Sequence, residues 1–216
     1  MMIKTFLEKA KSLSEVTEID ISSYRKMKKN GCTFLIHDYE LKGYGRFSTI
    51  EMKAMFSLMK METIVFTPLE KEMPLLSYDL ISAFSKHTLL LELYDTKVDT
   101  IPDLSRMDSV KEKYSTLKDN IPEKRWYDTM KLSPTLSKKG GKKKDYEALA
   151  SEWISSYFQI LSSAPNAEKD KKREKTLQYV DGLFANGGPS TEQFSRMFTK
   201  EVAYDLFTKY IFNAKK

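Results

Sequence analysis

The spacing of apolar positions divides the chain into a strand-rich first half and a helix-rich second half. An amphipathic N-terminal segment typical of a helix is followed by four short runs rich in β-branched and aromatic residues, which are typical of strands. These runs are CTFLIHD (32–38), METIVFTP (61–68), LLSYDLISAF (75–84) and HTLLLELYD (87–95). Because only a hairpin-length gap separates the last two, they should be antiparallel neighbours.

From residue 144 the apolar residues recur with a helical period. The first predicted helix is marked by Tyr146, Leu149, Ala150, Trp153, Ile154, Tyr157, Phe158 and Leu161. A second helix should run through EKTLQYVDGLFA (174–185) and stop at the Asn-Gly-Gly-Pro segment 186–189. Ser190 is then expected to be an N-cap. One bent helix or two short ones should follow, with apolar stripes formed by Phe194, Met197, Phe198, Val202, Leu206, Phe207 and Tyr210.

Strands followed by helices predict an α+β fold. We expect an α/β/α sandwich, in which helices flank a central antiparallel sheet, and a single domain spanning residues 1–216. Two lysine-rich segments, 137–144 and 168–175, are expected to be solvated. The first is predicted to be an exposed loop and the second the charged start of a helix.

Charge and composition narrow the function only partly. The net charge is +6 and the sequence pI is near 9.1, which favours encounters with nucleic acid, anionic lipid or an acidic protein without choosing among them. The single cysteine, Cys32, excludes an internal disulfide, and two histidines are too few to suggest a metal site. No apolar run reaches the ~20 residues that cross a bilayer, and the N-terminal segment is unlike a signal peptide. We therefore expect a cytoplasmic protein.

Motifs that bind nucleotides or carry hydrolytic chemistry are absent from the sequence. It contains no GxxxxGK[ST] loop, no GxGxxG turn and no GxSxG elbow. The segment Gly43-Tyr44-Gly45 lacks a following glycine and is predicted to be a turn or bulge.

Asp79 departs from the pattern around it, because it lies inside the run LLSYDLIS, where strand packing disfavours an acid. Strand alternation places it on one face with Ser77 and Ile81, and places Tyr78 and Leu80 on the other. Periodicity alone favours a solvent-facing acid on a half-exposed sheet.

Two blocks of the sequence resemble the ferredoxin-dependent bilin reductases. The segment 47–96 is similar to the central block of that family, with Phe66-Thr67-Pro68 ending one strand, Met73-Pro74 before the strand that carries Asp79, and an acid in the following strand. The segment 177–212 is similar to the closing block, with Tyr179 and Asn186 seven residues apart. Trp126 resembles an aromatic residue that precedes the outer strand of the family. Together these matches cover about half of the chain.

The resemblance implies a fold and a reaction. Family members bind a linear tetrapyrrole such as biliverdin between one face of an antiparallel sheet and the C-terminal helices. They hold no flavin or metal, so single electrons would come from an acidic ferredoxin and the protein would supply protons. Asp79 matches the central proton-donating aspartate. Burial would raise its pKa, and pyrrole N–H groups would stabilise its anion.

The resemblance also implies further binding residues. Asn186 matches a pocket position, although an asparagine before two glycines equally suits a helix C-cap. Phe56 stands where some members carry a pocket histidine, so the resemblance does not support reactions that need that histidine. Glu92 is expected either to share proton delivery or to have a structural or surface role. Ser77 should line the pocket beside Asp79.

The two propionates of a bilin need cations, and Arg46 or Lys53 could supply one. A basic surface around the pocket would steer an acidic ferredoxin toward it. Two alternatives stay open: a basic nucleic-acid-binding protein without catalysis, and a bilin-binding relative without reductase activity. No RRM, KH or helix-turn-helix signature supports the first. We expect a monomer without membrane contact, and the sequence does not indicate which double bond is reduced.

Overall fold

An eight-stranded antiparallel sheet forms the middle layer of the computed structural model, which describes residues 2–215. The strands follow the order β1-β3-β4-β5-β6-β7-β8, and β2 pairs with β3 beside β1. Their bounds are β1 Val16–Ile19, β2 Lys26–Lys29, β3 Cys32–Leu41, β4 Gly45–Ala54, β5 Met59–Thr67, β6 Leu75–Ala83, β7 Lys86–Tyr94 and β8 Leu136–Lys139.

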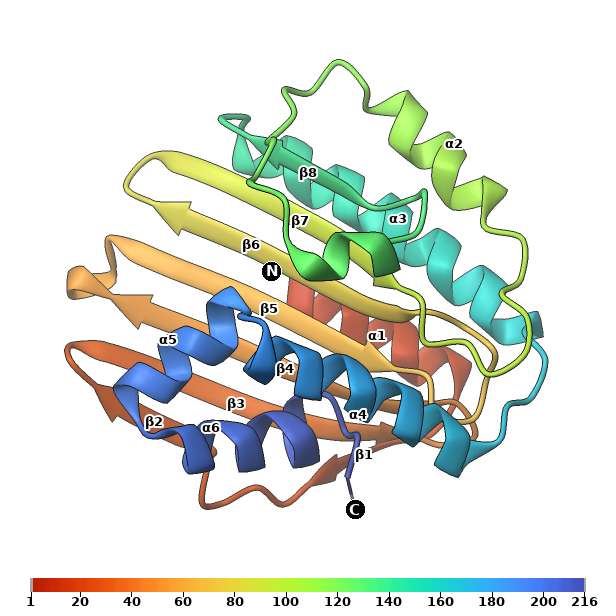
Figure 1. Ribbon diagram of the computed structural model, residues 1–216. Helices are drawn as coiled ribbons and strands as arrows, with labels where there is room; N and C mark the ends of the chain where they lie inside the picture. Colours follow the sequence, from red (N-terminus) through yellow and green to blue (C-terminus); the bar gives the residue numbers. More distant parts are fainter. Residues whose placement is uncertain (1, 216) are drawn as a thin grey trace.

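Helices cover both faces of this sheet (Figure 1). One face carries α1 (Met2–Leu13), α2 (Ser105–Lys113) and α3 (Lys143–Ser163). The other face carries η2 (Trp126–Met130), α4 (Lys169–Ala185), α5 (Pro189–Met197), α6 (Lys200–Leu206) and η3 (Phe207–Ile211), while η1 (Met55–Ser57) forms a hairpin tip. The predicted α+β fold, with an antiparallel sheet between helical layers, is confirmed.

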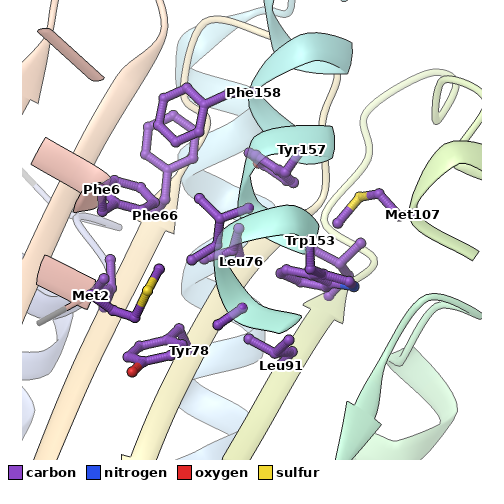
Figure 2. Packing of buried hydrophobic residues seen from close by; sticks show 14 of the residues in the cluster. Met2, Phe6, Phe66, Leu76, Tyr78, Leu91, Met107, Trp153, Tyr157 and Phe158 are labelled. Atoms are coloured by element: carbon purple, nitrogen blue, oxygen red, sulfur yellow. The ribbon is translucent and has the colours of Figure 1, made fainter. Parts of the chain in front are cut away.

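The sheet separates two apolar cores. In the first, α1 and α3 pack on β5–β7, with Phe6, Phe66, Tyr78 and Trp153 almost fully buried (Figure 2). The Trp153 indole N–H donates to the carbonyl of Pro134 at 3.1 Å, so its polar atom is satisfied. In the second core, the C-terminal helices pack on β3–β5. Burying each large apolar side chain contributes about 1.5–3 kcal/mol.

The last helical turn is attached to the middle of the sheet by two side-chain hydrogen bonds. The Ser48 hydroxyl of β4 donates to the carbonyl of Ile211 at 3.0 Å. The Thr67 hydroxyl of β5 donates to the carbonyl of Phe212 at 2.7 Å. Because both hydroxyls are buried, these bonds satisfy them and fix η3 over β4 and β5.

Not every predicted element has the predicted bounds. The four predicted strands and the helices at 144–161 and 174–185 are present, but β1, β2, β4, β8 and α2 were not predicted. Gly43 and Tyr44 lie in the turn between β3 and β4, as predicted, and Gly45 begins β4. Ser190 is not an N-cap, because α5 already begins at Pro189 and its N-cap is Gly188.

Two lysines expected in solvent are buried. Lys138 lies in β8, where its ammonium contacts the carbonyl of Leu117 and the carboxylate of Asp119. Lys172, in the first turns of α4, donates to the carbonyls of Met73 at 2.8 Å and Thr96 at 3.0 Å. Both segments were predicted from their charge alone. The prediction failed for these two lysines because tertiary contacts supply carbonyl and carboxylate acceptors that compensate for burial.

Candidate functional site

A cavity of about 180 Å³ lies between β4–β7 and the helices of the second face. Most of its lining is apolar or aromatic, with a few polar groups, which is the composition of small-molecule sites. The lining residues are Ile50, Met61, Thr63, Val65, Ser77, Asp79, Ile81, Leu90, Glu92, Tyr94, Tyr127, Tyr179, Leu183, Gly188, Pro189, Ser190, Thr191, Phe194, Phe207, Ile211 and Phe212.

The carboxylate of Asp79 faces this cavity from the middle of β6. Its strand partner Thr63 donates a hydroxyl hydrogen bond to Oδ1, and the Ser77 hydroxyl lies 3.4 Å from Oδ2. Burial raises the pKa of Asp79 to about 6, against the opposing effect of the Thr63 hydrogen bond, and the charge of Glu92 raises it further. The group therefore exchanges its proton close to neutral pH, as a general acid must.

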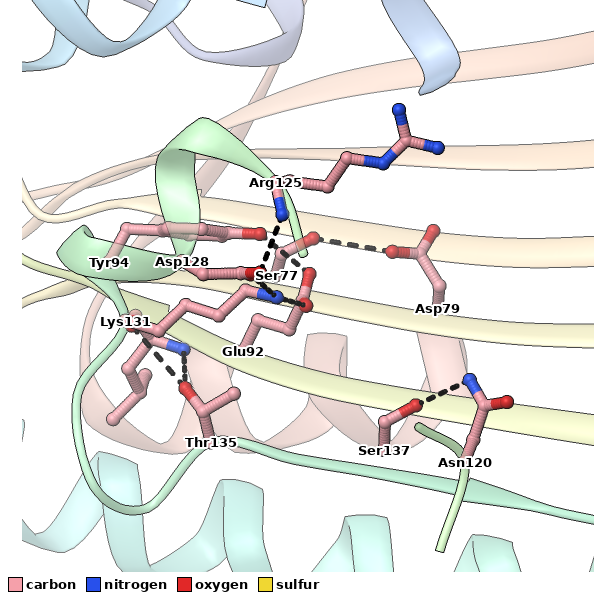
Figure 3. A network of polar contacts seen from close by, with 11 residues as sticks. Ser77, Asp79, Glu92, Tyr94, Asn120, Arg125, Asp128, Lys131, Thr135 and Ser137 are labelled. Carbon is pink, nitrogen blue, oxygen red and sulfur yellow. Dashed lines mark hydrogen bonds and ion pairs between the residues drawn. The ribbon is translucent and has the colours of Figure 1, made fainter. Parts of the chain in front are cut away.

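A polar network holds a second carboxylate on the neighbouring strand (Figure 3). The Lys131 ammonium lies 2.8 Å from Glu92 Oε1 and 2.7 Å from Asp128 Oδ1. The Tyr94 hydroxyl donates to Glu92 Oε2 at 2.7 Å, and Lys131 also lies over the ring of Tyr127. Burial alone would lower the pKa of Lys131, but the two carboxylates outweigh it and raise that pKa.

Three of the predicted site residues meet at the cavity. Asp79, Ser77 and Glu92 all line it, on adjacent strands β6 and β7. The predicted alternation of β6 is confirmed, because Tyr78 and Leu80 face the opposite core. Periodicity alone favoured a solvent-facing Asp79, and this is wrong: the helical layer covers that face of the sheet.

Asn186 and Phe56 lie outside the cavity. Asn186 is exposed at the end of α4, where it is the C-cap and Gly187, with a φ of 89°, makes the left-handed turn. Phe56 is fully exposed at the tip between β4 and β5. Both had been placed by similarity of short sequence blocks, which does not fix the direction of a side chain near a turn.

Neither cation predicted for the propionates lines the cavity. Arg46 pairs with Asp38, which is fully buried at the far end of β3. Burial raises the pKa of Asp38 to about 7, although the Arg46 guanidinium opposes this shift. Lys53 is exposed near the other end of β4 and, by strand alternation, on the opposite face from Ile50, which lines the cavity.

Sequence reasoning missed Thr63, Lys131 and Tyr127. Thr63 lies in a predicted strand, and only the register opposite Asp79 reveals its role. Lys131 and Tyr127 belong to η2, in a connection that the apolar pattern left unassigned. Among residues 2–215, no three His, Cys, Asp or Glu side chains gather into a metal-binding group. No helix in this range is long and apolar enough to cross a membrane.

No protein-family model matches the chain, and no curated protein matches it in sequence. Its structure is similar to that of phytochromobilin synthase from tomato, solved in complex with biliverdin, with a TM-score of 0.75. The match covers 99% of this chain and 82% of the other, at 11% sequence identity. The two proteins share a fold. At this identity, the likeness concerns the fold alone.

Proposed function

We propose that this chain is a bilin reductase, which binds a biliverdin-type linear tetrapyrrole in the Asp79 cavity and reduces it with single electrons from a reduced ferredoxin. The observation that carries the proposal is the placement of Asp79. An acid with a pKa of about 6 projects into an apolar cavity, between the sheet and the C-terminal helices of this fold. The tomato protein that shares the fold was solved with biliverdin.

The chemistry requires protons as well as electrons. Each electron accepted by the conjugated pigment gives a radical that becomes more basic, and a proton from a nearby acid then neutralises it. Two electrons and two protons together saturate one double bond. Asp79 would donate from its protonated form and recover a proton from solvent through the cavity. Glu92, held by Lys131 and Tyr94, is better suited to tuning Asp79 than to donating.

The cavity must widen to accept such a substrate. Its volume of about 180 Å³ is below the ~300 Å³ at which drug-sized ligand sites begin. Helix α5 contributes four residues to the lining and is joined to α4 through Gly187 and Gly188. We infer that α5 moves outward on binding, because α4 and η3 are held more firmly. The buried Lys172 fixes the start of α4, and Ser48 and Thr67 fix η3.

A cation for the propionates is still needed, since neither Arg46 nor Lys53 lines the cavity or lies on η2, whose Tyr127 does. Arg125 is the candidate we propose. Its side chain is exposed and extends away from the Glu92 network at the start of η2 (Figure 3). Among residues 2–215 its guanidinium forms no ion pair, so it is available for a carboxylate.

The decisive experiment is an anaerobic titration of the purified protein with biliverdin, followed by reduced ferredoxin. We expect one-to-one binding with a shift of the visible spectrum, and then loss or displacement of that band. Asp79→Asn should bind the pigment and fail to reduce it, whereas Asp99→Asn, at an exposed site, should behave as wild type. Ile81→Trp should block binding by filling the cavity beside an unchanged Asp79.

Other outcomes would replace the proposal. Binding without turnover in the wild-type protein would indicate a bilin-binding relative instead of a reductase. If the pigment does not bind and the protein instead retards an oligonucleotide in a gel, a nucleic-acid-binding function is the better explanation.

A further inference from the structure

Four turns come together at one end of the sheet, the end that lies on the left in Figure 1. They join β2 to β3, β4 to β5 and β6 to β7, and lead from β8 into α3. The β4–β5 and β6–β7 tips are directly connected, because the backbone N–H of Phe84 donates to the carbonyl of Leu58 at 2.9 Å. The Gly140 N–H donates to the carbonyl of His87 at 3.0 Å, which attaches the β8 turn to the same end.

Apolar side chains project from the two connected tips. Phe56 is 104% exposed, Phe84 68%, Met55 56% and Leu58 52%. Among residues 2–215 the other large apolar side chain with comparable exposure is Ile121. Met55, Phe56 and Phe84 also have φ values between 50° and 56°, a left-handed conformation that bulky residues rarely adopt. Phe56 and Phe84 are the most exposed of the four, and Met55 and Leu58 are about half covered.

Lysines surround the apolar tips, and the tip segments themselves contain no acid. Segments 26–33, 53–60, 84–88 and 137–144 contain no Asp, Glu or Arg. Their ten exposed lysines are Lys26, Lys28, Lys29, Lys53, Lys60, Lys86, Lys139, Lys142, Lys143 and Lys144. Within residues 2–215 only Lys143 of this set forms an ion pair, with Glu147 at 3.3 Å. Glu51 and Glu62 lie behind Lys53 and Lys60 on β4 and β5. The tips therefore carry a net positive charge in front of these two acids.

The combination of lysine with projecting apolar residues distinguishes among anionic partners. Protein interfaces are enriched in arginine and depleted of lysine, and base recognition relies on arginine forks and on flat aromatic platforms. Here arginine is absent and the aromatic rings stand at convex tips. A bilayer has no pocket to match: it accepts apolar tips at the depth of its headgroups and attracts flexible lysines through its surface potential.

We propose that this end of the molecule binds the surface of an anionic phospholipid bilayer, with Phe56 and Phe84 inserted among the headgroups and the lysines held against them. The contact is peripheral and reversible. It revises the expectation of no membrane contact, which rested on the lack of a membrane-spanning run. Each lysine near the surface strengthens binding about fivefold, and each inserted Phe about tenfold or more.

The test is co-sedimentation of the full chain with vesicles of phosphatidylserine and phosphatidylcholine, compared with phosphatidylcholine alone. We expect binding to the anionic vesicles that weakens as salt is added. The double variant Phe56→Asn/Phe84→Asn, whose asparagines suit the left-handed backbone, should bind at least about 100-fold more weakly. Ile121→Asn removes a comparably exposed apolar side chain outside the β4–β5 and β6–β7 tips and should bind as wild type.

Two further double variants test whether binding depends on where the positive charge lies or only on the net charge. Lys28→Gln/Lys86→Gln should weaken binding about 20-fold. Lys11→Gln/Lys175→Gln makes the same change in net charge on other elements, α1 and α4, and should leave binding nearly unchanged. Phe56→Trp should show a blue shift of emission when anionic vesicles are added, which reports insertion directly.

Failure to sediment with anionic vesicles, or equal binding by the tip and control variants, would overturn the proposal. An oligonucleotide or acidic protein that binds in a Phe56-dependent way, while vesicles do not, would assign the surface to that partner. The proposal is independent of the reductase proposal, because vesicle binding does not require Asp79.

Discussion

Replacing Asp79 by asparagine should stabilise the protein at neutral pH while abolishing its proposed reaction. The pKa of Asp79 is about 6 in the folded protein and has an ordinary value of 3.8. This difference corresponds to about 3 kcal/mol. Between pH 4 and 6 the folded state keeps a proton that the unfolded chain has lost, so wild-type stability falls as the pH rises through that window. Above it, the whole penalty of a buried anion is present.

Asparagine carries no charge and its amide oxygen can still accept the Thr63 hydroxyl hydrogen bond. The free energy of unfolding, measured by urea denaturation from pH 4 to pH 8, should therefore be equal in both proteins at the acid limit. At neutral pH the variant should exceed wild type by up to about 3 kcal/mol. The exposed control Asp99→Asn should show no such divergence. A variant that is less stable at pH 7, or a difference independent of pH, would refute the assignment of a buried, proton-exchanging Asp79.

Three other substitutions test neighbouring parts of the argument. Thr63→Val removes a hydrogen bond that lowers the pKa of Asp79, so the pH profile of turnover should move to higher pH. Burial lowers the pKa of Lys172 to about 8, so wild-type stability should rise with pH between 8 and 10, and Lys172→Met should lose that slope in alkaline denaturation experiments. Gly182→Ala places a Cβ 2.3 Å from the Trp126 ring and should lower stability by about 1–3 kcal/mol, measured by urea unfolding.

The sequence predicted the site residues correctly where strand alternation alone determines which face of the sheet they occupy. Asp79 was identified because an acid interrupts an apolar run, and the period of two placed it on the face opposite Tyr78. Strand alternation does not show whether that face is exposed to solvent or covered by helices. The answer depends on α4 to η3, which begin 90 residues after Asp79 in the sequence and pack back on the sheet.

Predictions that rested on charge or on short sequence blocks were less successful. Lys172 was expected in solvent because it lies in a charged run, yet tertiary contacts give its ammonium two carbonyl acceptors. Arg46 and Lys53 were chosen for proximity in sequence, but they lie at opposite ends of β4 and on different faces. Strand β4 itself was not predicted, since charged residues interrupt its apolar positions.

The sheet separates the α1–α3 core, which stabilises the fold, from the side that carries the candidate site. Adjacent residues of β6 lie on opposite sides of the sheet: Tyr78 packs in the α1–α3 core, and Asp79 lines the cavity. Substitutions in the α1–α3 core should lower the free energy of unfolding without changing which ligands the cavity binds. Substitutions among the residues that line the cavity should cost little stability. Proteins related to this chain can therefore acquire new ligands while they keep the same fold.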